Sequence, residues 1–394
     1  MRIAFFTEGY DPFINGAVTS IKTLRSALDR QGHEVVIFTP ACPGYDDRDP
    51  QVRRLPGMQW NKNLYPLLSP LAYRTDPLSD ESFDVIHSHH PFTMSRLAAR
   101  LAGKHDLPLI YTFHTLLHEY GHYVPFLPAA GRYWLTRQYL RHCAEADVVH
   151  TATEAVRHLL LQQGVQTQIE VAPLGVPAVS PAAGAREAMR KSLGISPRTP
   201  LLLYVGRLAR EKGLELLLRA VARLAAGRGF HLCLVGGGPM EGRLRELARD
   251  LGLAQRVTFS GWVRHEEIGG HYAAADVFVL PSPAETMGLV LVEAMSAGLP
   301  CVAIDKYGPS EVVVDGLTGF LTPFDEGDFG EAIQRLLDNA FLCQRMATAA
   351  RARACDFHPD VAAAAMVRVY EDAIADRERL RLGSFQNQKQ ESLA

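Results

Sequence analysis

The sequence predicts an α/β protein made of two doubly wound domains. Its 394 residues suggest two domains at roughly 100–200 residues each. Short runs of β-branched and aromatic residues alternate with helical patterns through both halves of the chain. The predicted strands are continuously apolar, which is typical of parallel sheets that helices cover on both faces.

The first half contains predicted strands separated by helical patterns. One helix is expected from about Ala17 to Gln31, because Gly32 is a residue type common just past a helix end. Another is expected between Thr153, a residue type suited to the N-cap, and Gly164. The predicted strands are Ile3–Thr7, Val35–Thr39, Val85–Ser88, Leu109–Thr112, Val148–Ala152 and Ile169–Ala172.

The second half repeats the alternation of strands and helices. The predicted helices lie near residues 213–226, 239–251, 288–297 and 327–339. The predicted strands are Leu201–Val205, Leu232–Val235, Val257–Ser260, Val277–Leu280 and Cys301–Ile304.

The best domain boundary is the segment 173–185, because it is rich in proline, glycine and alanine. An N-terminal domain is therefore predicted over 1–175 and a C-terminal domain over 183–357. A long helix at about 359–379 is expected to pack back on the N-terminal domain. The polar tail 380–394 is expected to be disordered.

Composition and charge exclude several classes of protein. The formal net charge of -2 gives no global basic field, so no nucleic-acid partner is expected. The six cysteines are widely spaced without a CxxC pair, which argues against a structural zinc site or a disulfide scaffold. No window approaches about 18 uninterrupted apolar residues, and the N-terminal apolar run is too short for a signal peptide. A cytoplasmic protein is expected, with any membrane contact peripheral.

The clearest chemical signal is PSPAETMGLVLVEAMSAGLPCVA at residues 281–303. Glu285 follows a predicted strand and therefore lies at a carboxyl end, where ligands of doubly wound sheets bind. Met287, Gly288 and Leu289 then open a helix, whose free N–H groups and partial positive charge suit a diphosphate. Glu293 lies about two turns beyond Glu285, so the two carboxylates could grip two sets of hydroxyl groups.

A second signal is YVGRLAREKGLELLL at residues 204–218. Arg207 and Lys212 follow a strand and precede a helix. A departing diphosphate must be stabilised by positive charge, for which arginine supplies a fork of donors and lysine a point charge. A solvated helix start is the structural alternative for this pair.

Weaker signals come from loops that follow other strands. The glycine-rich loop VGGGPMEGRL at 235–244, which contains Gly238, lacks the full GxGxxG spacing. Asn15 and Gly16 precede a helix, where glycine would allow close approach of a phosphate or sugar. His114 stands just past a strand.

Two short motifs point to metals but have simpler explanations. His118-Glu119-x-x-His122 matches the zinc-peptidase pattern HExxH, yet Gly121 interrupts the helix that this pattern needs. Asp47-Arg48-Asp49 is a DxD in a polar loop, for which a solvated charged loop is the favoured interpretation. The run of histidines from His87 to His90 favours a structural or acceptor-side role over a ligand cluster.

Taken together, Glu285, Glu293 and the following AMSAGLPCV resemble the donor signature of family 4 retaining glycosyltransferases. Met287 stands where phenylalanine is commoner in that family, a volume-conserving difference. The resemblance implies the GT-B fold, in which two Rossmann-like domains face each other across a cleft. It also implies a nucleotide-sugar donor and no required cofactor or metal.

The resemblance also implies a role for individual residues. Four residues would form the catalytic group. Glu285 would orient the sugar, and His114 would lie beside it. Arg207 and Lys212 would bind the diphosphate. Further donor contacts are implied for Gly16, Gly238, Val263, Met287, Gly288, Leu289 and, on the ribose, Glu293. Trp262 and Val263 lie in FSGWV (259–263), which resembles the base-contacting segment of the family.

The order of residues in HTLLHEYGHYVP resembles the members that glucosylate diacylglycerol. That resemblance assigns Asn15, His118, Tyr120 and His122 to the acceptor side. It also indicates UDP-glucose as the favoured donor. The segments 58–74 and 123–141 mix aromatic, apolar and basic residues, a composition suited to an anionic membrane surface on the inner face of the cell membrane. A packed helix with a solvated basic face would have the same composition.

The most remote alternative to a lipid glycosyltransferase is a zinc metallopeptidase that acts through His118-Glu119-x-x-His122. Two nearer alternatives also stay open at this stage. One is the same transfer to a soluble acceptor such as a sugar phosphate or polyol. The other is a regulatory protein that binds a nucleotide sugar without catalysis, although the intact charged motifs argue against a degenerate site.

Overall fold

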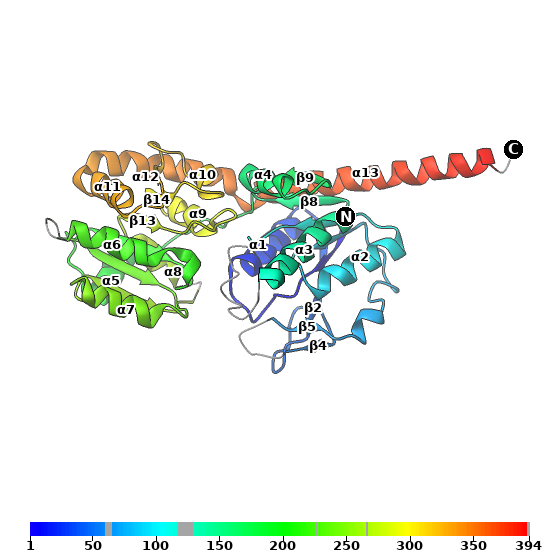
Figure 1. Ribbon diagram of the computed structural model, residues 1–394, viewed down its shortest axis with the longest axis horizontal. Helices are drawn as coiled ribbons and strands as arrows, with labels where there is room; N and C mark the ends of the chain where they lie inside the picture. The colour runs from blue at the N-terminus through cyan, green and yellow to red at the C-terminus, as the bar shows by residue number, and fades with distance from the viewer. Residues whose placement is uncertain (60–64, 117–128, 226, 228, 265–266, 392–394) are drawn as a thin grey trace. The chain divides into compact units, whose positions relative to one another are not determined.

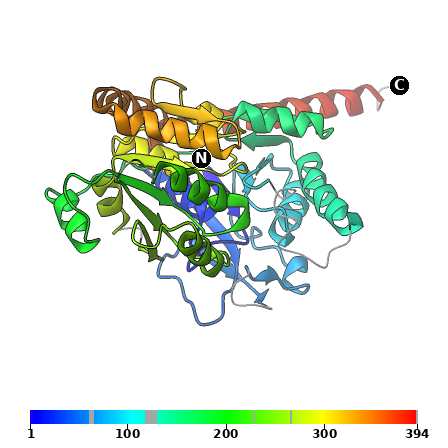
Figure 2. The ribbon, with the colours of Figure 1, turned by 60° about the vertical axis from the view of Figure 1, so that its left-hand side comes forward.

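The computed structural model describes residues 1–59, 65–116, 129–225, 227, 229–264 and 267–391, with side chains for all of these except 129–136 and 383–391. The chain forms two compact units (Figures 1 and 2). The N-terminal unit combines Met1–Gly175 with Pro359–Ala394, and the C-terminal unit is Val176–His358.

The N-terminal unit is built on a parallel sheet of seven strands. Its spatial order is β3-β2-β1-β6-β7-β8-β9, so the direction of strand addition reverses between β1 and β6. The strands are β1 (Arg2–Phe6), β2 (Glu34–Pro40), β3 (Val52–Leu55), β6 (Val85–Ser88), β7 (Leu109–Thr112), β8 (Val148–Thr151) and β9 (Gln168–Val171). A small antiparallel pair, β4 (Gly57–Met58) and β5 (Leu67–Leu68), lies outside this sheet.

The helices of this unit begin and end where local chemistry requires. In α1 (Gly16–Arg30), the Asn15 Oδ1 atom accepts a hydrogen bond from the backbone N–H of Val18 at 3.1 Å, which caps the first turn. The helix stops before Gly32, whose φ of +83° favours glycine. The other helices are α2 (Thr93–His105), α3 (Ala129–Glu145), α4 (Glu154–Gln162) and α13 (Pro359–Glu391).

Helix α13 completes the core of the N-terminal unit. Buried alanine, methionine, valine and tyrosine side chains of α13 join the apolar cluster formed by α1 and the central strands. These side chains are Ala363, Met366, Val369, Tyr370 and Ala373. Helices α1 and α13 contact each other directly (Figure 1).

The expected disordered tail is wrong over most of its length. Helix α13 continues to Glu391, so residues 380–391 form its last turns. The physical reason is helix propensity, because leucine, arginine, glutamine, lysine and glutamate predominate there and a single glycine, Gly383, is the one strong breaker.

The C-terminal unit contains a second parallel sheet, of six strands. Its order is β12-β11-β10-β13-β14-β15, and the direction of strand addition reverses between β10 and β13. The strands are β10 (Leu201–Val205), β11 (His231–Val235), β12 (Val257–Gly261), β13 (Val277–Leu280), β14 (Cys301–Ile304) and β15 (Gly319–Thr322).

Helices pack in pairs around this sheet, α6 with α7 and α11, α5 with α8, and α9 with α12. The helices are α5 (Ala185–Ser192), α6 (Leu214–Leu224), α7 (Glu241–Asp250), α8 (Ile268–Ala274), α9 (Leu289–Ser296), α10 (Pro309–Val312), α11 (Glu326–Asp338) and α12 (Ala340–Ala354). All strands predicted from the sequence are present within one residue of their expected ends. The sequence prediction did not include β3, β4, β5 and β15.

A buried chain of hydrogen bonds crosses the N-terminal sheet just beyond its apolar core. The Tyr370 hydroxyl lies 2.7 Å from His87 Nδ1, and His87 Nε2 lies 2.6 Å from Thr112 Oγ1. The Thr112 hydroxyl lies 2.8 Å from His150 Nδ1, and His150 Nε2 lies 2.9 Å from the carbonyl oxygen of Ala172.

The direction of every bond in this chain follows from its last acceptor. A carbonyl oxygen can only accept, so His150 carries its proton on Nε2 and accepts from Thr112 at Nδ1. The Thr112 oxygen must then accept from His87 Nε2, which leaves His87 Nδ1 to accept from Tyr370. Burial lowers the pKa of His150 to about 4 and that of His87 well below its usual range, so both rings are neutral at pH 7.

This chain makes a prediction about the substitution Tyr370→Phe. Removing the hydroxyl leaves the buried Nδ1 atom of His87 without its donor, so the free energy of unfolding should fall by about 1–3 kcal/mol. Chemical denaturation, followed by a signal from the N-terminal unit, measures the change. The control is Tyr73→Phe, whose hydroxyl lies 3.5 Å from the Arg96 carbonyl oxygen at an exposed position and should change stability by less than about 0.5 kcal/mol. Equal losses in the two variants would contradict the assignment.

Candidate functional site

In the C-terminal unit, the predicted donor residues gather where the strand order reverses. Strands β10 and β13 are neighbours in the sheet, although two other strands separate them in the sequence. Arg207 and Lys212 follow β10, and Glu285 follows β13. Ligands of doubly wound sheets bind at the carboxyl ends of strands at such a switch point. The topology therefore brings these three predicted residues to one edge of the sheet.

Lys212 and Glu285 form a direct ion pair. The Lys212 Nζ atom lies 2.7 Å from Glu285 Oε1, and the side chains are only 15% and 14% exposed. The pair joins the loop after β10 to the loop after β13. Each charge is therefore held in place by the other.

Arg207 is held by a residue that the sequence analysis did not single out. Its guanidinium lies 2.6 Å from the Oε1 atom of Glu211, whose side chain is 2% exposed, while the Arg207 side chain is 41% exposed. The Tyr204 hydroxyl donates to the carbonyl oxygen of Arg207 at 2.9 Å. The arginine thus has a buried anchor and an accessible end. The four-residue spacing between Arg207 and Glu211 was the sequence signal that could have identified it.

The glycine-rich loop after β11 supports the backbone that carries Arg207. The Gly237 carbonyl oxygen accepts from the Leu208 N–H at 2.9 Å. A Cβ atom on Gly238 would lie 2.4 Å from the Leu208 carbonyl oxygen, which explains why only glycine fits there. Gly238 therefore packs directly against the backbone of the loop that carries Arg207. Its predicted contact with the nucleoside stays a prediction.

The turn from Glu285 to Leu289 leads into helix α9. Gly288 occupies the N-cap position with φ of +85°, in the left-handed region, and Leu289 is the first helical residue. Met287 is buried below the turn. Gly308 supports it from the loop after β14, because its N–H donates to the Glu285 carbonyl oxygen at 3.1 Å and a Cβ atom there would lie 2.3 Å from Met287 Cα.

Glu293 is buried on α9 and accepts a hydrogen bond from Tyr272. The Tyr272 hydroxyl lies 2.6 Å from Glu293 Oε2. Burial raises the pKa of Tyr272 well above its usual range, and the negative charge of Glu293 adds to the rise. Nothing in the single sequence distinguished Tyr272. The predicted ribose contact of Glu293 stays a prediction, and Tyr272 fixes the orientation of the carboxylate that would make it.

Trp262 and Val263 follow β12 on the same edge of the sheet. Trp262 is 69% exposed, and a Cβ atom on Gly237 would lie 2.5 Å from its Nε1 atom. The indole therefore lies over Gly237 with much of its surface open, as a stacking surface for a base would require.

In the N-terminal unit, the switch point lies between β1 and β6. Asn15 and Gly16 follow β1 and open α1, and the Asn15 side chain donates to the Tyr65 hydroxyl. Glu8 lies on the same loop and is fully buried. Its Oε1 atom accepts from the Met94 N–H and from the Thr93 hydroxyl, so it caps helix α2.

His114 follows β7 and contacts His89, which follows β6. The His114 Nε2 atom lies 3.2 Å from His89 Nδ1. Burial lowers the pKa of both rings well below the usual range. His90 has a different partner, Thr7, whose oxygen lies 2.8 Å from His90 Nδ1. The histidine run is thus structural at His87 and His90, while His89 contacts a predicted site residue.

Three predicted acceptor residues, His118, Tyr120 and His122, lie outside the described residues, as does the whole HExxH match. The DxD motif lies within the described residues, and its two aspartates form ion pairs within the N-terminal unit. Asp47 is paired with Arg54 at 2.6 Å, and Asp49 with Arg25 at 2.6 Å. Both were expected to be solvated, and Asp49 is 42% exposed, whereas Asp47 is only 8% exposed because Arg54 of β3 binds it. Within the described part of the chain, no group of three or more histidine, cysteine or acidic residues could hold a metal ion.

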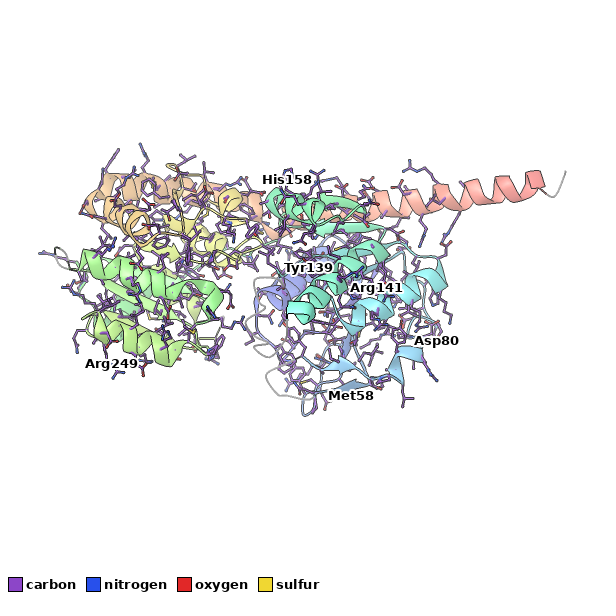
Figure 3. The ribbon with its side chains drawn as sticks, in the orientation of Figure 1. Met58, Asp80, Tyr139, Arg141, His158 and Arg249 are labelled. Carbon is purple, nitrogen blue, oxygen red and sulfur yellow. The ribbon has the colours of Figure 1, made fainter. Side chains whose placement is uncertain are left out.

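The described residues of the two aromatic and basic segments divide between core and surface. Tyr139 of α3 is buried and donates to Gln163, whereas Arg141 is exposed and pairs with Glu145 (Figure 3). Met58 and Leu71, from the other segment, are exposed. No helix among the described residues is both long and apolar enough to cross a membrane.

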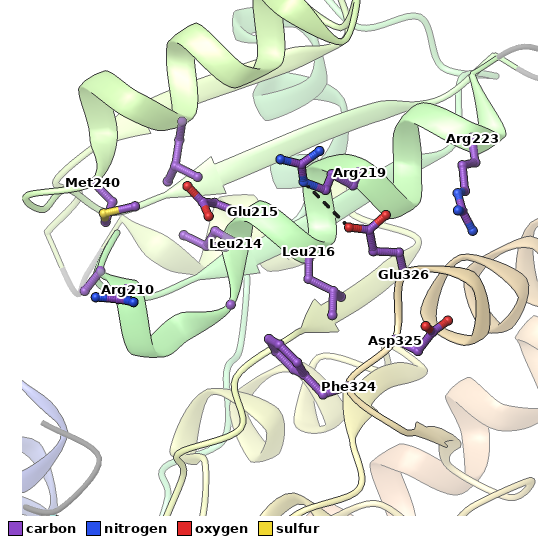
Figure 4. A pocket seen from close by; sticks show the side chains of 13 residues that line it. Arg210, Leu214, Glu215, Leu216, Arg219, Arg223, Met240, Phe324, Asp325 and Glu326 are labelled. Atoms are coloured by element: carbon purple, nitrogen blue, oxygen red, sulfur yellow. Dashed lines mark ion pairs between the residues drawn. The ribbon is translucent and has the colours of Figure 1, made fainter. Parts of the chain in front are cut away.

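A pocket of about 500 Å³ opens beside α6 in the C-terminal unit (Figure 4). Arg219 and Glu326 form an ion pair at 3.6 Å across it, and Arg210, Arg223 and Phe324 also line it. The described residues that line this pocket include none of the predicted donor residues. Its lining shares the loop 209–213 with the switch-point site but has balanced charge.

Comparison with known protein families covers both units. Residues 14–179 match the description "Glycosyltransferase Family 4", and residues 185–353 match "Glycosyl transferases group 1". The two matches together cover most of both units and leave out residues 1–13 and helix α13.

Curated relatives and solved structures agree with these matches. An alpha-monoglucosyldiacylglycerol synthase of Acholeplasma laidlawii is 30% identical over 340 residues, covering 81% of this chain and 84% of that protein. A D-inositol 3-phosphate glycosyltransferase of Nocardia farcinica is 30% identical over 401 residues, covering 92% and 86%. The structure of Anabaena HepE in complex with UDP superposes with a TM-score of 0.77 at 21% identity, covering 94% of this chain and all of that one.

The buried carboxyl group of Glu8 makes stability depend on pH. Burial raises its pKa from 4.5 to about 8, so the folded protein keeps a proton there that the unfolded chain releases near pH 4.5. Between these values the folded state binds more protons, and the free energy of unfolding therefore decreases as pH rises, by up to about 1.4 kcal/mol per unit.

The substitution Glu8→Gln should remove this slope, because glutamine keeps the acceptor for Met94 but does not ionise. Thermal unfolding measured from pH 5 to 9 compares the two proteins. Glu154→Gln, at an exposed position, is the control and should leave the slope unchanged. Parallel curves for wild type and Glu8→Gln would contradict the assignment.

Proposed function

The chain belongs to the family 4 glycosyltransferases, and from that premise we propose that it transfers glucose from UDP-glucose to a diacylglycerol with retention of configuration. It is a nucleotide-sugar-dependent hexosyltransferase with the GT-B fold. The observation that carries the donor half of the proposal is the convergence of Arg207, Lys212 and Glu285 at the β10–β13 switch point.

The chemistry of the donor residues follows from their contacts. Arg207 and Lys212 would stabilise the negative charge that develops on the diphosphate as the sugar departs. The N-terminal amides of α9, from Gly288 and Leu289 onward, would add hydrogen bonds to the same oxygens. Glu285 would accept hydrogen bonds from sugar hydroxyls, and Glu293 from those of the ribose.

Two residues of the N-terminal unit complete the proposal. His114 would donate a hydrogen bond to the transferred sugar, and Gly16 would let the donor approach the backbone closely. Glu285 is bound to Lys212, which suits a residue that orients substrate and not a covalent nucleophile. The acceptor hydroxyl would therefore attack on the face from which the diphosphate leaves.

The lipid acceptor is supported by relatives and by sequence. The Acholeplasma relative is named for the synthesis of alpha-monoglucosyldiacylglycerol, a product with the linkage that retention from UDP-glucose would give. Exposed Met58, Leu71 and Arg141 offer apolar and basic contacts to an anionic membrane surface. A peripheral position on the inner face of the cell membrane would bring the enzyme to such an acceptor.

A soluble acceptor is the second candidate, and one observation favours it. The Nocardia relative, named for transfer to D-inositol 3-phosphate, has the same 30% identity and covers more of this chain. The donor half of the site would be the same for either acceptor. The two candidates therefore differ only in what the N-terminal unit binds.

The ion pair between Lys212 and Glu285 can be tested by a double-mutant cycle. Lys212→Met or Glu285→Gln alone leaves the remaining, largely buried charge without its nearest opposite charge. Each substitution should therefore lower the free energy of unfolding by roughly 1–3 kcal/mol. The double variant should lose less than the sum of the two, while all three variants lose transferase activity by about 100-fold or more.

The exposed pair Arg245–Glu241 on α7 serves as the control cycle, with an expected coupling below about 0.5 kcal/mol. Additive losses at Lys212 and Glu285, or full activity in Glu285→Gln, would remove the central assignment.

An acceptor assay separates the two candidate functions. Purified enzyme is incubated with UDP-glucose, UDP-galactose or GDP-mannose and either diacylglycerol vesicles or an inositol phosphate, with and without EDTA. We expect UDP release and an α-linked glucolipid with UDP-glucose and vesicles, at a rate that EDTA does not change. Transfer only to the soluble acceptor would establish the second candidate, and no nucleotide release with any donor would refute the proposed function.

A further inference from the structure

His89 and His114 stand next to each other at the ends of neighbouring strands. Strands β6 and β7 pair in parallel, with Ser88 opposite Tyr111. Side chains alternate along a strand, so His87 and His89 share a face, as do Thr112 and His114. The two rings of His89 and His114 stack with centroids 5.5 Å apart and planes 29° apart. His89 is therefore the direct neighbour of the predicted sugar contact.

One hydrogen bond links the two rings, and its direction decides where each carries its proton. Burial lowers the pKa of both histidines well below the usual range, so both are neutral at pH 7 and each holds a single N–H. In the contact between His89 Nδ1 and His114 Nε2, one nitrogen must therefore donate and the other accept.

The far nitrogen of His89 decides between the two directions. Its Nε2 atom is buried and has no hydrogen-bond partner among the described residues. If His114 donated, the proton of His89 would have to sit on that atom as a buried, unsatisfied N–H. If His89 donates from Nδ1, the atom left there is a bare nitrogen. Orphaned buried N–H groups are the rarer and less tolerated of the two.

The rings around His89 hold it in that position. Phe5 packs edge-on against it with centroids 4.7 Å apart, and the His87 ring lies 4.0 Å away. The tautomer and orientation of His87 are themselves set by Tyr370 and Thr112. His89 therefore packs against His87, a ring whose tautomer and orientation are fixed by its own hydrogen bonds.

We propose that His89 is a positioning residue that holds His114 in the tautomer with its proton on Nδ1. His114 then keeps an N–H donor on the side of the ring away from His89. This inference rests on the proposed function, in which His114 donates a hydrogen bond to the transferred sugar. His89 itself would touch neither donor nor acceptor.

Two variants of His89 test the proposal. His89→Asn keeps a side-chain donor near the position of Nδ1, whereas His89→Leu removes it at similar volume. We expect His89→Leu to lower kcat about ten-fold or more with a donor KM changed less than about two-fold, and His89→Asn to recover most of the rate. Wild-type kcat in His89→Leu, or equal impairment of both variants, would overturn the proposal.

A matched control separates positioning from general stability. His142 is a buried histidine of the same unit that pairs with Glu145 at 3.3 Å, and His142→Leu should lower stability without changing kcat. UDP affinity, measured by calorimetry, should stay unchanged in all variants, because Arg207, Lys212 and Glu293, which would bind the nucleotide, belong to the C-terminal unit.

Nitrogen NMR of the imidazoles gives a readout that does not depend on activity. In ¹⁵N-histidine-labelled protein, the His114 signals, assigned with His114→Gln, should show a protonated Nδ1 and a bare Nε2 in the wild type. That pattern should persist in His89→Asn and change in His89→Leu. A wild-type His114 protonated on Nε2 would refute the positioning role. If no donor and acceptor pair gave any transfer, the proposed function would fail while this spectrum still decided the tautomer.

Discussion

A parallel sheet that helices cover on both faces restricts where polar chemistry can lie. The strand interiors are buried and apolar, so charged groups are confined to the strand ends and the loops beyond them. In both units the strand order reverses at one pair of neighbours, β1 with β6 and β10 with β13. Loops leave those neighbours in opposite directions, which opens room at the carboxyl edge. Every predicted site residue that the structure describes lies at or beyond such an edge.

The N-terminal unit shows how this constraint is met where polar groups do enter the sheet. His87, Thr112 and His150 are buried and lie within one residue of the carboxyl ends of three adjacent strands. They satisfy one another in a chain that begins at Tyr370 of α13 and ends at the Ala172 carbonyl oxygen. A buried polar network stabilises a single arrangement only when every member is satisfied. The C-terminal helix is thus part of the N-terminal unit through a hydrogen bond as well as through apolar contacts.

Much of the fold could be predicted because long apolar strands and helical periods repeat regularly. The misses have physical causes. β15 (Gly319–Thr322) is short and begins with glycine, so its propensity for a strand is weak. The tail after residue 380 is polar and without an apolar face, so composition favoured disorder, whereas the structure continues helix α13. The helix propensity of the same residues favours the helical extension.

The candidate site was predictable only where a residue and its neighbours form a motif. Lys212 and Glu285 lie in contact because they follow strands β10 and β13, which the topology makes neighbours, and Arg207 leaves the same strand as Lys212. Tyr272 and His89 were missed because their importance comes from long-range contacts, whereas Glu211 lies only four positions from Arg207 and was overlooked beside Lys212. Tyr272 reaches Glu293 across 21 positions and His89 reaches His114 across 25. A single sequence carries no signal for such pairs.

The charges in the C-terminal site are compensated before any diphosphate is considered. Arg207 is paired with Glu211 and Lys212 with Glu285, so these four groups together carry no net charge. Net attraction from them therefore cannot account for binding of a diphosphate. Under the proposed function, affinity would come from directed hydrogen bonds, made by the accessible end of Arg207, by Lys212 and by the N-terminal amides of α9. Glu211 is too buried to contact a ligand. Glu285 belongs to a loop, and its carboxylate would release Lys212 and accept hydrogen bonds from sugar hydroxyls. Sugar and diphosphate would then be recognised together, because a ligand that draws Lys212 toward phosphate leaves Glu285 to accept hydrogen bonds from the hydroxyl groups of the attached sugar.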